Sequence, residues 1–215
     1  MGGIFITFEG GEGSGKSTQI QRLAARLTEA GHKVCAIREP GGTPISEEIR
    51  YLLKHSNVNQ AMTAETELLL MNASRAQLVR ETIRPALQAG EIVLSDRFYD
   101  STTAYQGYGR GLDMKFVKAV IDFAIGETRP DLTLFLRVPV DVSEERRRSR
   151  QATLPFERDR IEEANREFFD RVGQGFDAIA AAEPDRVKVL DASGSMDDVS
   201  SRIWNHVAPL LAQRP

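Results

Sequence analysis

The chain has 215 residues, 28 Lys and Arg against 31 Asp and Glu, and a formal net charge of -3. This balance excludes a global positive field that would hold a polynucleotide or an anionic membrane, so we expect neither as a partner. The lone cysteine, Cys35, excludes an internal disulfide and is typical of a reducing compartment, which predicts a cytoplasmic protein. The length predicts one domain or at most two small ones, and with no linker visible we expect a single domain over residues 1–215. No apolar run approaches the ~18 to 20 residues of a membrane span.

Short apolar runs of strand length alternate with helical patterns along the chain. The runs are rich in β-branched residues and predict buried strands at 4–8, 33–37, 92–95, 132–138 and 187–190. Between and after them, apolar residues at helical spacing predict a helix before Gly31, a long leucine-rich helix at 64–89 and a final helix at about 199–211. This alternation predicts an α/β fold, with a five-stranded parallel sheet covered by helices on both faces in three layers. Ligands in such folds bind beyond the carboxyl ends of the strands.

A glycine-rich segment follows the first predicted strand. Residues 10–17 read G-x-x-x-x-G-K-S and precede an amphipathic helix, which is the context that separates a P-loop from a chance match. Backbone N–H groups would hold the phosphates of a nucleoside triphosphate, Lys16 would reach the β and γ phosphates, and the Ser17 hydroxyl would ligate Mg²⁺. The alternative is an ordinary glycine-rich turn with an exposed lysine. The residues expected at the triphosphate are Gly10, Gly11, Glu12, Gly13, Ser14, Gly15, Lys16, Ser17 and Thr18.

Asp96 and Arg97 follow directly after the third predicted strand, at 92–95. A carboxylate at the end of an apolar strand is the second metal-binding element of P-loop proteins, so Asp96 is expected to hold Mg²⁺ directly or through water. The planar guanidinium of Arg97 suits phosphate oxygens and could neutralise the phosphoryl group during transfer. Together these features predict the P-loop NTPase fold.

Two classes of P-loop protein remain: a kinase with a second substrate, and a nucleotide-dependent switch or binding module. A guanine-reading switch needs N-K-x-D, which does not occur in the chain. A kinase needs a cationic lid that excludes water. Arginines flank an aperiodic stretch at 151–155, which predicts a mobile, hinged lid at about 146–160, although a solvated helix face is the alternative. These arginines are Arg146, Arg147, Arg148, Arg150, Arg158 and Arg160.

Several short motifs behind the P-loop carry a family resemblance. Glu-Pro-Gly-Gly-Thr occupies 39–43, Ala-Ser-Arg-Ala-Gln 73–77, Asp-Arg-Phe 96–98, Ala-Tyr-Gln-Gly 104–107 and Arg-Gly 110–111. In this order they resemble the bacterial thymidylate kinases from about residue 4 to residue 191. The resemblance implies transfer of a phosphoryl group from ATP to dTMP, giving dTDP and ADP, with Mg²⁺ as cofactor and a homodimer as the assembly. The alternative within enzymes is another nucleotide or deoxynucleoside kinase.

The same resemblance implies a role for individual residues at the acceptor. Arg75 would donate to O4 of thymine, Thr102 and Gln106 would line the base, and Tyr105 would crowd the 2′ position. Arg50 and Arg97 would meet the phosphate of the acceptor, and Glu12 and Glu39 would lie close to its sugar and phosphate end. Many relatives stack an aromatic ring on the base where this chain has Met71, whose thioether can also pack on a ring. The expected dTMP-binding residues are Glu39, Pro40, Arg50, Met71, Arg75, Arg97, Thr102, Tyr105 and Gln106.

On the donor side, the resemblance implies that lid arginines close over ATP and that Arg146, with the backbone at 191–193, holds adenine. Some relatives carry a catalytic arginine inside the P-loop, whereas positions 11–14 here contain none, so the lid would supply it. The expected catalytic residues are Lys16, Arg97, Glu12, Arg150 and Arg158. Arg137 stands where relatives often have a carboxylate.

Base selection can also be argued from hydrogen-bond chemistry. Arg75 has donors and no acceptor, so it suits thymine O4 and opposes the amino group of cytosine. Mismatched buried polar groups cost far more than a lost contact, so we expect strong rejection of cytosine. Uracil differs from thymine by one methyl group, which is worth only about 10 to 200-fold.

Overall fold

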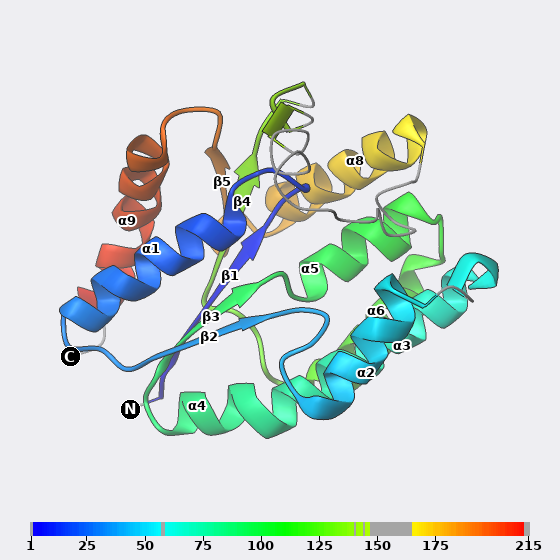
Figure 1. The fold of residues 1–215 in the computed structure, drawn as a ribbon, viewed down its shortest axis with the longest axis horizontal. Coiled ribbons are helices and arrows are strands. Elements are labelled where there is room, and N and C mark those ends of the chain that lie inside the picture. The colour runs from blue at the N-terminus through cyan, green and yellow to red at the C-terminus, as the bar shows by residue number, and fades with distance from the viewer. Residues whose placement is uncertain (1, 57–58, 140, 144, 147–164, 213–215) are drawn as a thin grey trace.

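The computed structural model describes residues 2–56, 59–139, 141–143, 145–146 and 165–212. Within them, a parallel five-stranded sheet has the strand order β2-β3-β1-β4-β5 (Figure 1). The sequence prediction of this sheet is confirmed, with strand ends within a residue of those expected. The strands are β1 (Ile4–Glu9), β2 (Val34–Arg38), β3 (Ile92–Asp96), β4 (Leu132–Arg137) and β5 (Val187–Asp191).

The helices fall largely where the apolar spacing predicts them. The long helix expected at 64–89 is a succession of three elements: α3 (Ala64–Leu78), a π-helical segment η2 (Val79–Ile83) and α4 (Arg84–Gln88). Pro85 lacks the N–H that continues an α-helical ladder, which accounts for the wider turn just before it. None of the helices in the described ranges is both long and apolar enough to cross a bilayer. The others are α1 (Lys16–Glu29), α2 (Pro44–Lys54), η1 (Asn59–Ala61), α5 (Tyr99–Thr102), η3 (Thr103–Gly109), α6 (Met114–Ile125), α8 (Arg166–Ala182) and α9 (Met196–Ala212).

The sheet separates two apolar layers. Alternate side chains of β1 point to opposite faces, as in any strand: Ile6 packs with α1 and α9, whereas Phe5 packs with α3, η2 and α6. A smaller cluster joins α8 to β4 and β5 through Phe135 and Phe176. Figure 1 shows α1 and α9 together on one side of the sheet and the other helices on the opposite side.

The register of the parallel strands places their carboxyl ends side by side. Phe8 of β1 and Arg38 of β2 both lie opposite Asp96 of β3, while Arg137 of β4 lies opposite Asp191 of β5. The loops that leave β1, β2 and β3 therefore start at the same edge of the sheet. All three carry motifs singled out in the sequence.

Candidate active site

The loop after β1 requires glycine at two positions. Gly10 has φ 140°, and a Cβ there would lie 2.5 Å from the carbonyl oxygen of Leu136. Gly13 has φ 73°, and its Cβ would lie 2.6 Å from the carbonyl oxygen of Ser143. The loop then enters α1 at Gly15, with no side chain capping the helix. The N–H groups of the first turn are thus available for an anion.

Lys16 lies across this loop. Its Nζ donates to the carbonyl oxygens of Gly10 at 3.0 Å and Gly11 at 2.9 Å, and the residue is only 7% exposed. Burial, together with the positive charge of Arg97, lowers the pKa of Lys16 to about 8 despite nearby carboxylates. A phosphate group beside this amine would favour its charged form, because an opposite charge offsets desolvation.

The two residues expected to bind the metal are brought together. Ser17, in the first turn of α1, donates from Oγ to Oδ2 of Asp96 at the end of β3, with 2.7 Å between the oxygens. Mg²⁺ is commonly held by one or two protein oxygens together with substrate phosphates and water. A hydroxyl and a carboxylate at the mouth of a phosphate loop suit that ion. The described residues hold no cluster of three or more His, Cys, Asp or Glu that could bind a metal alone.

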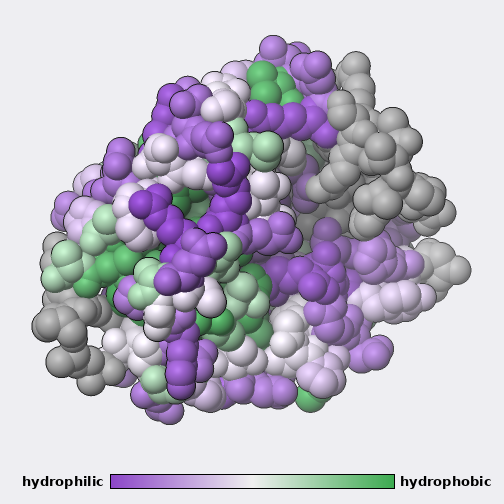
Figure 2. Space-filling model, turned by 60° about the vertical axis from the view of Figure 1, so that its left-hand side comes forward, coloured by the Kyte–Doolittle hydropathy of each residue, from purple (hydrophilic) through white to green (hydrophobic). Residues whose placement is uncertain are grey.

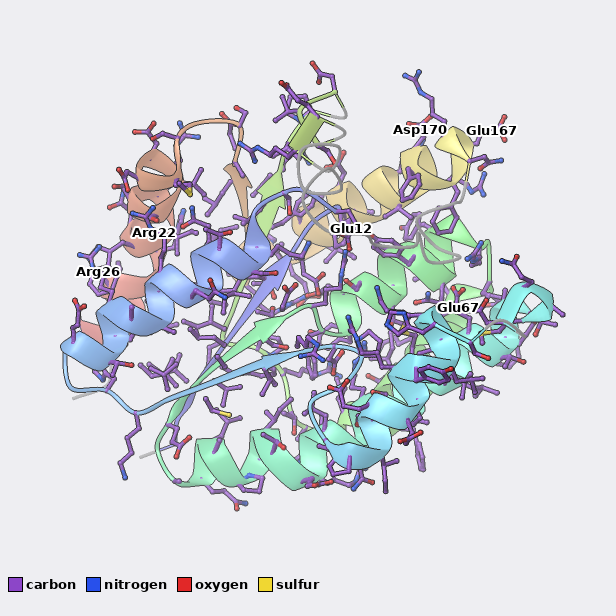
Figure 3. All side chains as sticks on the ribbon, viewed as in Figure 1. Glu12, Arg22, Arg26, Glu67, Glu167 and Asp170 are labelled. Atoms are coloured by element: carbon purple, nitrogen blue, oxygen red, sulfur yellow. The ribbon has the colours of Figure 1, made fainter. Side chains whose placement is uncertain are left out.

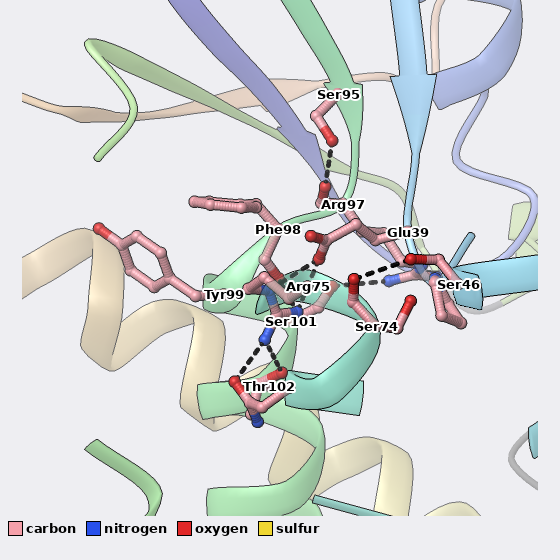
Figure 4. Close-up of polar contacts among 12 residues, drawn as sticks. Glu39, Ser46, Ser74, Arg75, Ser95, Arg97, Phe98, Tyr99, Ser101 and Thr102 are labelled. Atoms are coloured by element: carbon pink, nitrogen blue, oxygen red, sulfur yellow. Dashed lines mark hydrogen bonds and ion pairs between the residues drawn. The ribbon is translucent and has the colours of Figure 1, made fainter. Parts of the chain in front are cut away.

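Arg97 adopts a backbone conformation that side chains usually avoid. Its φ of 71° is the only positive value of a non-glycine residue in the described ranges. Ser95 Oγ donates to the carbonyl oxygen of Arg97, and the Arg97 guanidinium donates to Ser101 Oγ at 3.1 Å (Figure 4). The guanidinium also lies 3.8 Å from Glu12 and 5.1 Å above the ring of Tyr105. Strained residues of this kind cluster at functional sites, where the surrounding structure fixes them.

Sequence reasoning missed Glu9, which is linked to Arg97 through the hydroxyl group of Ser101. Its fully buried carboxylate accepts hydrogen bonds from the backbone N–H groups of Phe98 and Ser101 and from Ser101 Oγ. Burial and repulsion from Asp100 raise the pKa of Glu9 to about 7, against the opposing effect of Arg97. The only signal in the sequence was a carboxylate at the end of an apolar strand.

On the acceptor side, Arg75 is almost fully enclosed. Its Nε and Nη2 both lie within 2.8 Å of Glu39 Oε2, and Glu39 Oε1 is buried without a hydrogen-bond partner (Figure 4). Nη1 donates to Asn72 Oδ1 and Thr102 Oγ1, and Nη2 to the carbonyl oxygen of Phe98. Because an arginine has five N–H donors, all of them have acceptors here. The direct contact of Arg75 with thymine O4 stays a prediction.

A second buried polar group joins Glu67 of α3 to Gln106 and Arg110. Gln106 donates from Nε2 to Glu67 Oε1 at 2.8 Å, and Arg110 donates to both oxygens of Glu67 at 3.2 and 3.0 Å. Glu67 is fully buried although it carries a carboxylate (Figure 3 labels it on α3). No sequence pattern pointed to Glu67, because its partners lie about 40 residues away in the chain.

Three further predicted residues occupy the surroundings of these pairs. Arg50 donates to the carbonyl oxygen of Pro40 at 2.7 Å, which ties α2 to the loop after β2. Tyr105 is buried against the rings of Phe168 and Phe176. Burial raises the pKa of the Tyr105 phenol.

The expected lid and adenine site are described only in part. Arg146 donates to the carbonyl oxygens of Ala192 at 3.0 Å and Ser193 at 3.3 Å, so the structure joins it to the segment named with it. Arg150, Arg158 and nearly all of 146–160 lie outside the described residues. Arg137 forms an ion pair with Asp177 of α8, which gives this departure from the family pattern a local partner.

A parallel sheet, a glycine loop that opens α1, a buried lysine and an adjoining serine–aspartate pair together define a P-loop protein that binds a nucleoside triphosphate. A model of the thymidylate kinase family matches residues 8–203. The chain belongs to the thymidylate kinase family, as the sequence motifs indicate.

Individual relatives agree over almost the whole chain. The thymidylate kinase of Syntrophotalea carbinolica is 51% identical over 94% of this chain and 93% of its own. That of Pseudomonas fluorescens is 47% identical over 100% of this chain and 99% of its own. The crystal structure of thymidylate kinase from Ehrlichia chaffeensis superimposes with a TM-score of 0.77 at 34% identity, covering 97% of this chain and 99% of that one.

Proposed function

We propose that this protein transfers the γ-phosphoryl group of ATP to dTMP, giving dTDP and ADP. The observation that carries the proposal is that the two anion-binding groups, Lys16 and Arg97, both follow strands that end at the same edge of the sheet. The P-loop with Lys16 follows β1, Arg97 follows β3, and these strands are paired neighbours. Two phosphate groups can therefore meet at one edge of the sheet. The family of the chain supports thymidylate as the acceptor.

In this proposal the protein positions and neutralises charge, without forming a covalent bond to the substrate. Backbone amides of the P-loop and the α1 terminus hold the donor phosphates, and Lys16 turns from the carbonyl groups of the loop toward them. Arg97, fixed by Ser101, presents its donors to the acceptor phosphate. A phosphate monoester has a second pKa of about 6, so the acceptor is already a dianion near neutral pH and needs no general base.

Ser17 and Asp96 would hold Mg²⁺ beside the P-loop. The ion would neutralise charge on the phosphates and keep them aligned. The short distance between the two oxygens supports this assignment. Two ligands assigned among the described residues suit Mg²⁺, which usually takes one or two carboxylates together with substrate phosphates and water.

The acceptor would bind between α2, α3 and the segment α5–η3. We assign its phosphate to Arg50 and Arg97, its sugar to Glu12 and Tyr105, and its base to Met71, Thr102 and Gln106. We also assign Arg75 to O4 of the base, next to Thr102, while Glu39, which pairs with Arg75, and Pro40 would lie close to the sugar and phosphate end of the acceptor. Arg146 would hold adenine, and Arg150 and Arg158 would act from the lid within a single kinase domain.

We further propose that the protein works as a cytoplasmic homodimer, for which the single cysteine and the exposed apolar residues give support. Seven of the nine large apolar side chains exposed among the described residues lie on α2, α3 and α6, including Phe116 and Phe123. Figure 2 shows a face of the molecule on which hydrophobic residues lie among hydrophilic ones. Phe116→Glu with Phe123→Glu should lower the sedimentation coefficient to that of a monomer, whereas Met196→Glu on α9 should not. A dimer that survives the paired substitution would place the contact elsewhere.

The catalytic proposal is tested by an assay of ATP consumption. Each of dTMP, dUMP, dCMP, dAMP and dGMP is offered as acceptor, and the nucleoside diphosphate formed is quantified. A thymidylate kinase should be nearly silent until dTMP is added. Slow ATP hydrolysis that ignores every acceptor would instead indicate a switch or binding module, and a preference for another monophosphate would indicate a different nucleotide kinase.

A further inference from the structure

Resting on the proposed function, we propose that Glu67 is a positioning residue that sets which pyrimidine the pocket accepts, by fixing the orientation of the Gln106 amide. Glu67 lies behind the residues assigned to dTMP and is fully buried. It would therefore act on the base only through Gln106, with which it forms a hydrogen bond. The inference concerns the hydrogen-bonding polarity at one edge of the base. It follows from two side-chain hydrogen bonds that join α3 to the segment α5–η3.

Each of the two hydrogen bonds joins a charged residue of α3 to a polar residue of the segment α5–η3, but they run in opposite directions. Arg75 of α3 donates to Thr102, and Glu67 of α3 accepts from Gln106. Residues 67 and 75 are two helical turns apart and share a face of α3, with Met71 midway between them on that face. Thr102 and Gln106 are about one turn apart, so their side chains follow one another at a spacing of about 6 Å. A pyrimidine lying over Met71 would therefore meet both side chains along one edge.

The orientation of the Gln106 amide follows from the chemistry of Glu67. Arg110 donates to both oxygens of Glu67, which is the arrangement that an arginine makes with a carboxylate, and a carboxylate only accepts hydrogen bonds. Gln106 must therefore turn its NH₂ group toward Glu67. Its Oε1 accepts no hydrogen bond from the part of the chain that the structure describes. The group that Gln106 can offer to a ligand is thus an acceptor.

The Thr102 hydroxyl is left as a donor, whereas Gln106 is left as an acceptor. Its Oγ1 accepts a hydrogen bond from Arg75 at 2.9 Å, and the described residues offer no acceptor for its hydroxyl hydrogen. Thr102 can therefore donate to a ligand. The pair presents a donor at Thr102 and an acceptor at Gln106.

This pattern matches the edge of thymine and opposes that of cytosine. Thymine and uracil carry a carbonyl oxygen at C4 and an N–H at N3, which need a donor and an acceptor. Cytosine carries an amino group at C4 and an unprotonated N3, so both partners would be mismatched. A site with fixed polar groups rejects such an analogue strongly, because buried groups are left unpaired. Base selection then rests on the donor at Thr102, next to Arg75, and on the acceptor at Gln106, which Glu67 orients.

The decisive variant is Glu67→Gln, measured as kcat/KM for dTMP, dUMP and dCMP. An amide at position 67 can accept or donate, so Gln106 is released to turn over. The ratio of kcat/KM for dTMP to that for dCMP should fall by about tenfold or more. The ratio for dTMP to dUMP should stay unchanged, since these bases share the same edge. A loss that is equal for all three acceptors would overturn the inference.

Arg110→Lys is the matched control. It weakens the same buried ion pair but keeps an acceptor-only carboxylate against Gln106. Thermal unfolding should report a loss of stability in both variants, whereas only Glu67→Gln should change the choice between dTMP and dCMP. If Arg110→Lys changes that choice equally, Glu67 acts through general packing and the inference is wrong.

A measurement on the unmodified protein guards against a variant that fails to fold. The 3-methyl derivative of dTMP lacks the N3 hydrogen that Gln106 should accept. Its kcat/KM should be lower than that of dTMP by roughly 10² or more. Equal use of the two compounds would overturn the inference while leaving the kinase activity in place. A protein that ignores dTMP altogether would instead refute the proposed function.

Discussion

Ser17 Oγ and Asp96 Oδ2 lie 2.7 Å apart, although their residues are separated by 79 positions in the chain. The contact joins the first turn of α1 to the end of β3 and places two oxygen ligands beside the P-loop. Asp96→Asn should therefore weaken the apparent affinity for Mg²⁺, measured as the concentration that gives half-maximal phosphoryl transfer. We expect a loss of about 10 to 100-fold.

The control for this prediction is Asp185→Asn, which changes an exposed carboxylate between α8 and β5. It should leave the Mg²⁺ dependence as in the unmodified protein. An Asp96→Asn protein with an unaltered Mg²⁺ titration would show that the ion is held by other groups.

Lys16 connects burial to catalysis. The residue is enclosed by the P-loop, where desolvation lowers its pKa to about 8, so an incoming phosphate replaces carbonyl partners with a stronger one. Lys16→Ala should lower kcat by roughly 10² or more, because preorganised charge beside the transferred group is lost. The KM for dTMP should change much less, since Lys16 serves the donor. Single-turnover phosphoryl transfer measures this, and an unchanged kcat would remove Lys16 from the reaction.

The sequence could predict those parts of the site that are read from one stretch of chain. The P-loop pattern gives Lys16 and Ser17, and a carboxylate after an apolar strand gives Asp96. The register of a parallel sheet then places them together without further information. The same logic fixes the sheet itself, because its short apolar strands alternate with amphipathic helices.

Buried polar pairs between helices that are far apart in the chain cannot be predicted from sequence in this way. Glu67 looks like any acidic residue near the start of a helix, and its pairing with Gln106 depends on how α3 packs against η3. Arg75 was recognised, but its enclosure by Glu39, Thr102 and Phe98 needs both the loop after β2 and α5 with its N-cap residue in place. Periodicity gives the face of a helix, not its rotation against a neighbour, so such partners cannot be assigned from sequence.

Glu9 should make the stability of the protein fall as pH rises through a defined window. Its pKa is raised from 4.5 in the unfolded chain to about 7 in the folded one. Between these values the folded state holds more protons than the unfolded state, so the free energy of unfolding decreases with pH and levels off above 7. The contribution of this one group is on the order of 3 kcal/mol.

Glu9→Gln isolates this effect, because an amide of the same shape cannot ionise. Urea unfolding of both proteins at several pH values between 4 and 8 gives the difference in unfolding free energy. That difference should shift in favour of the variant as pH increases. Two stability curves that remain parallel across this range would mean that Glu9 has an ordinary pKa.

Arg75 and Glu39 form a buried ion pair whose side chains are each only 3% exposed. Replacing the arginine alone leaves a carboxylate sealed from water, with Oε1 already lacking a partner. Arg75→Met should therefore lower the free energy of unfolding by about 3 to 5 kcal/mol. The double variant Arg75→Met with Glu39→Gln removes the stranded charge, so it should recover part of the loss.

Activity should not follow stability in this pair of variants. Thr102 loses the donor that fixes its hydroxyl in both proteins, so the KM for dTMP should be raised and base choice relaxed in the single and the double variant alike. Chemical unfolding and kinetics with dTMP and dCMP on the same preparations separate the two effects. If the double variant regains stability and the KM for dTMP together, Arg75 has only a structural role, because its contribution to the acceptor site would then be no more than the neutralisation of Glu39.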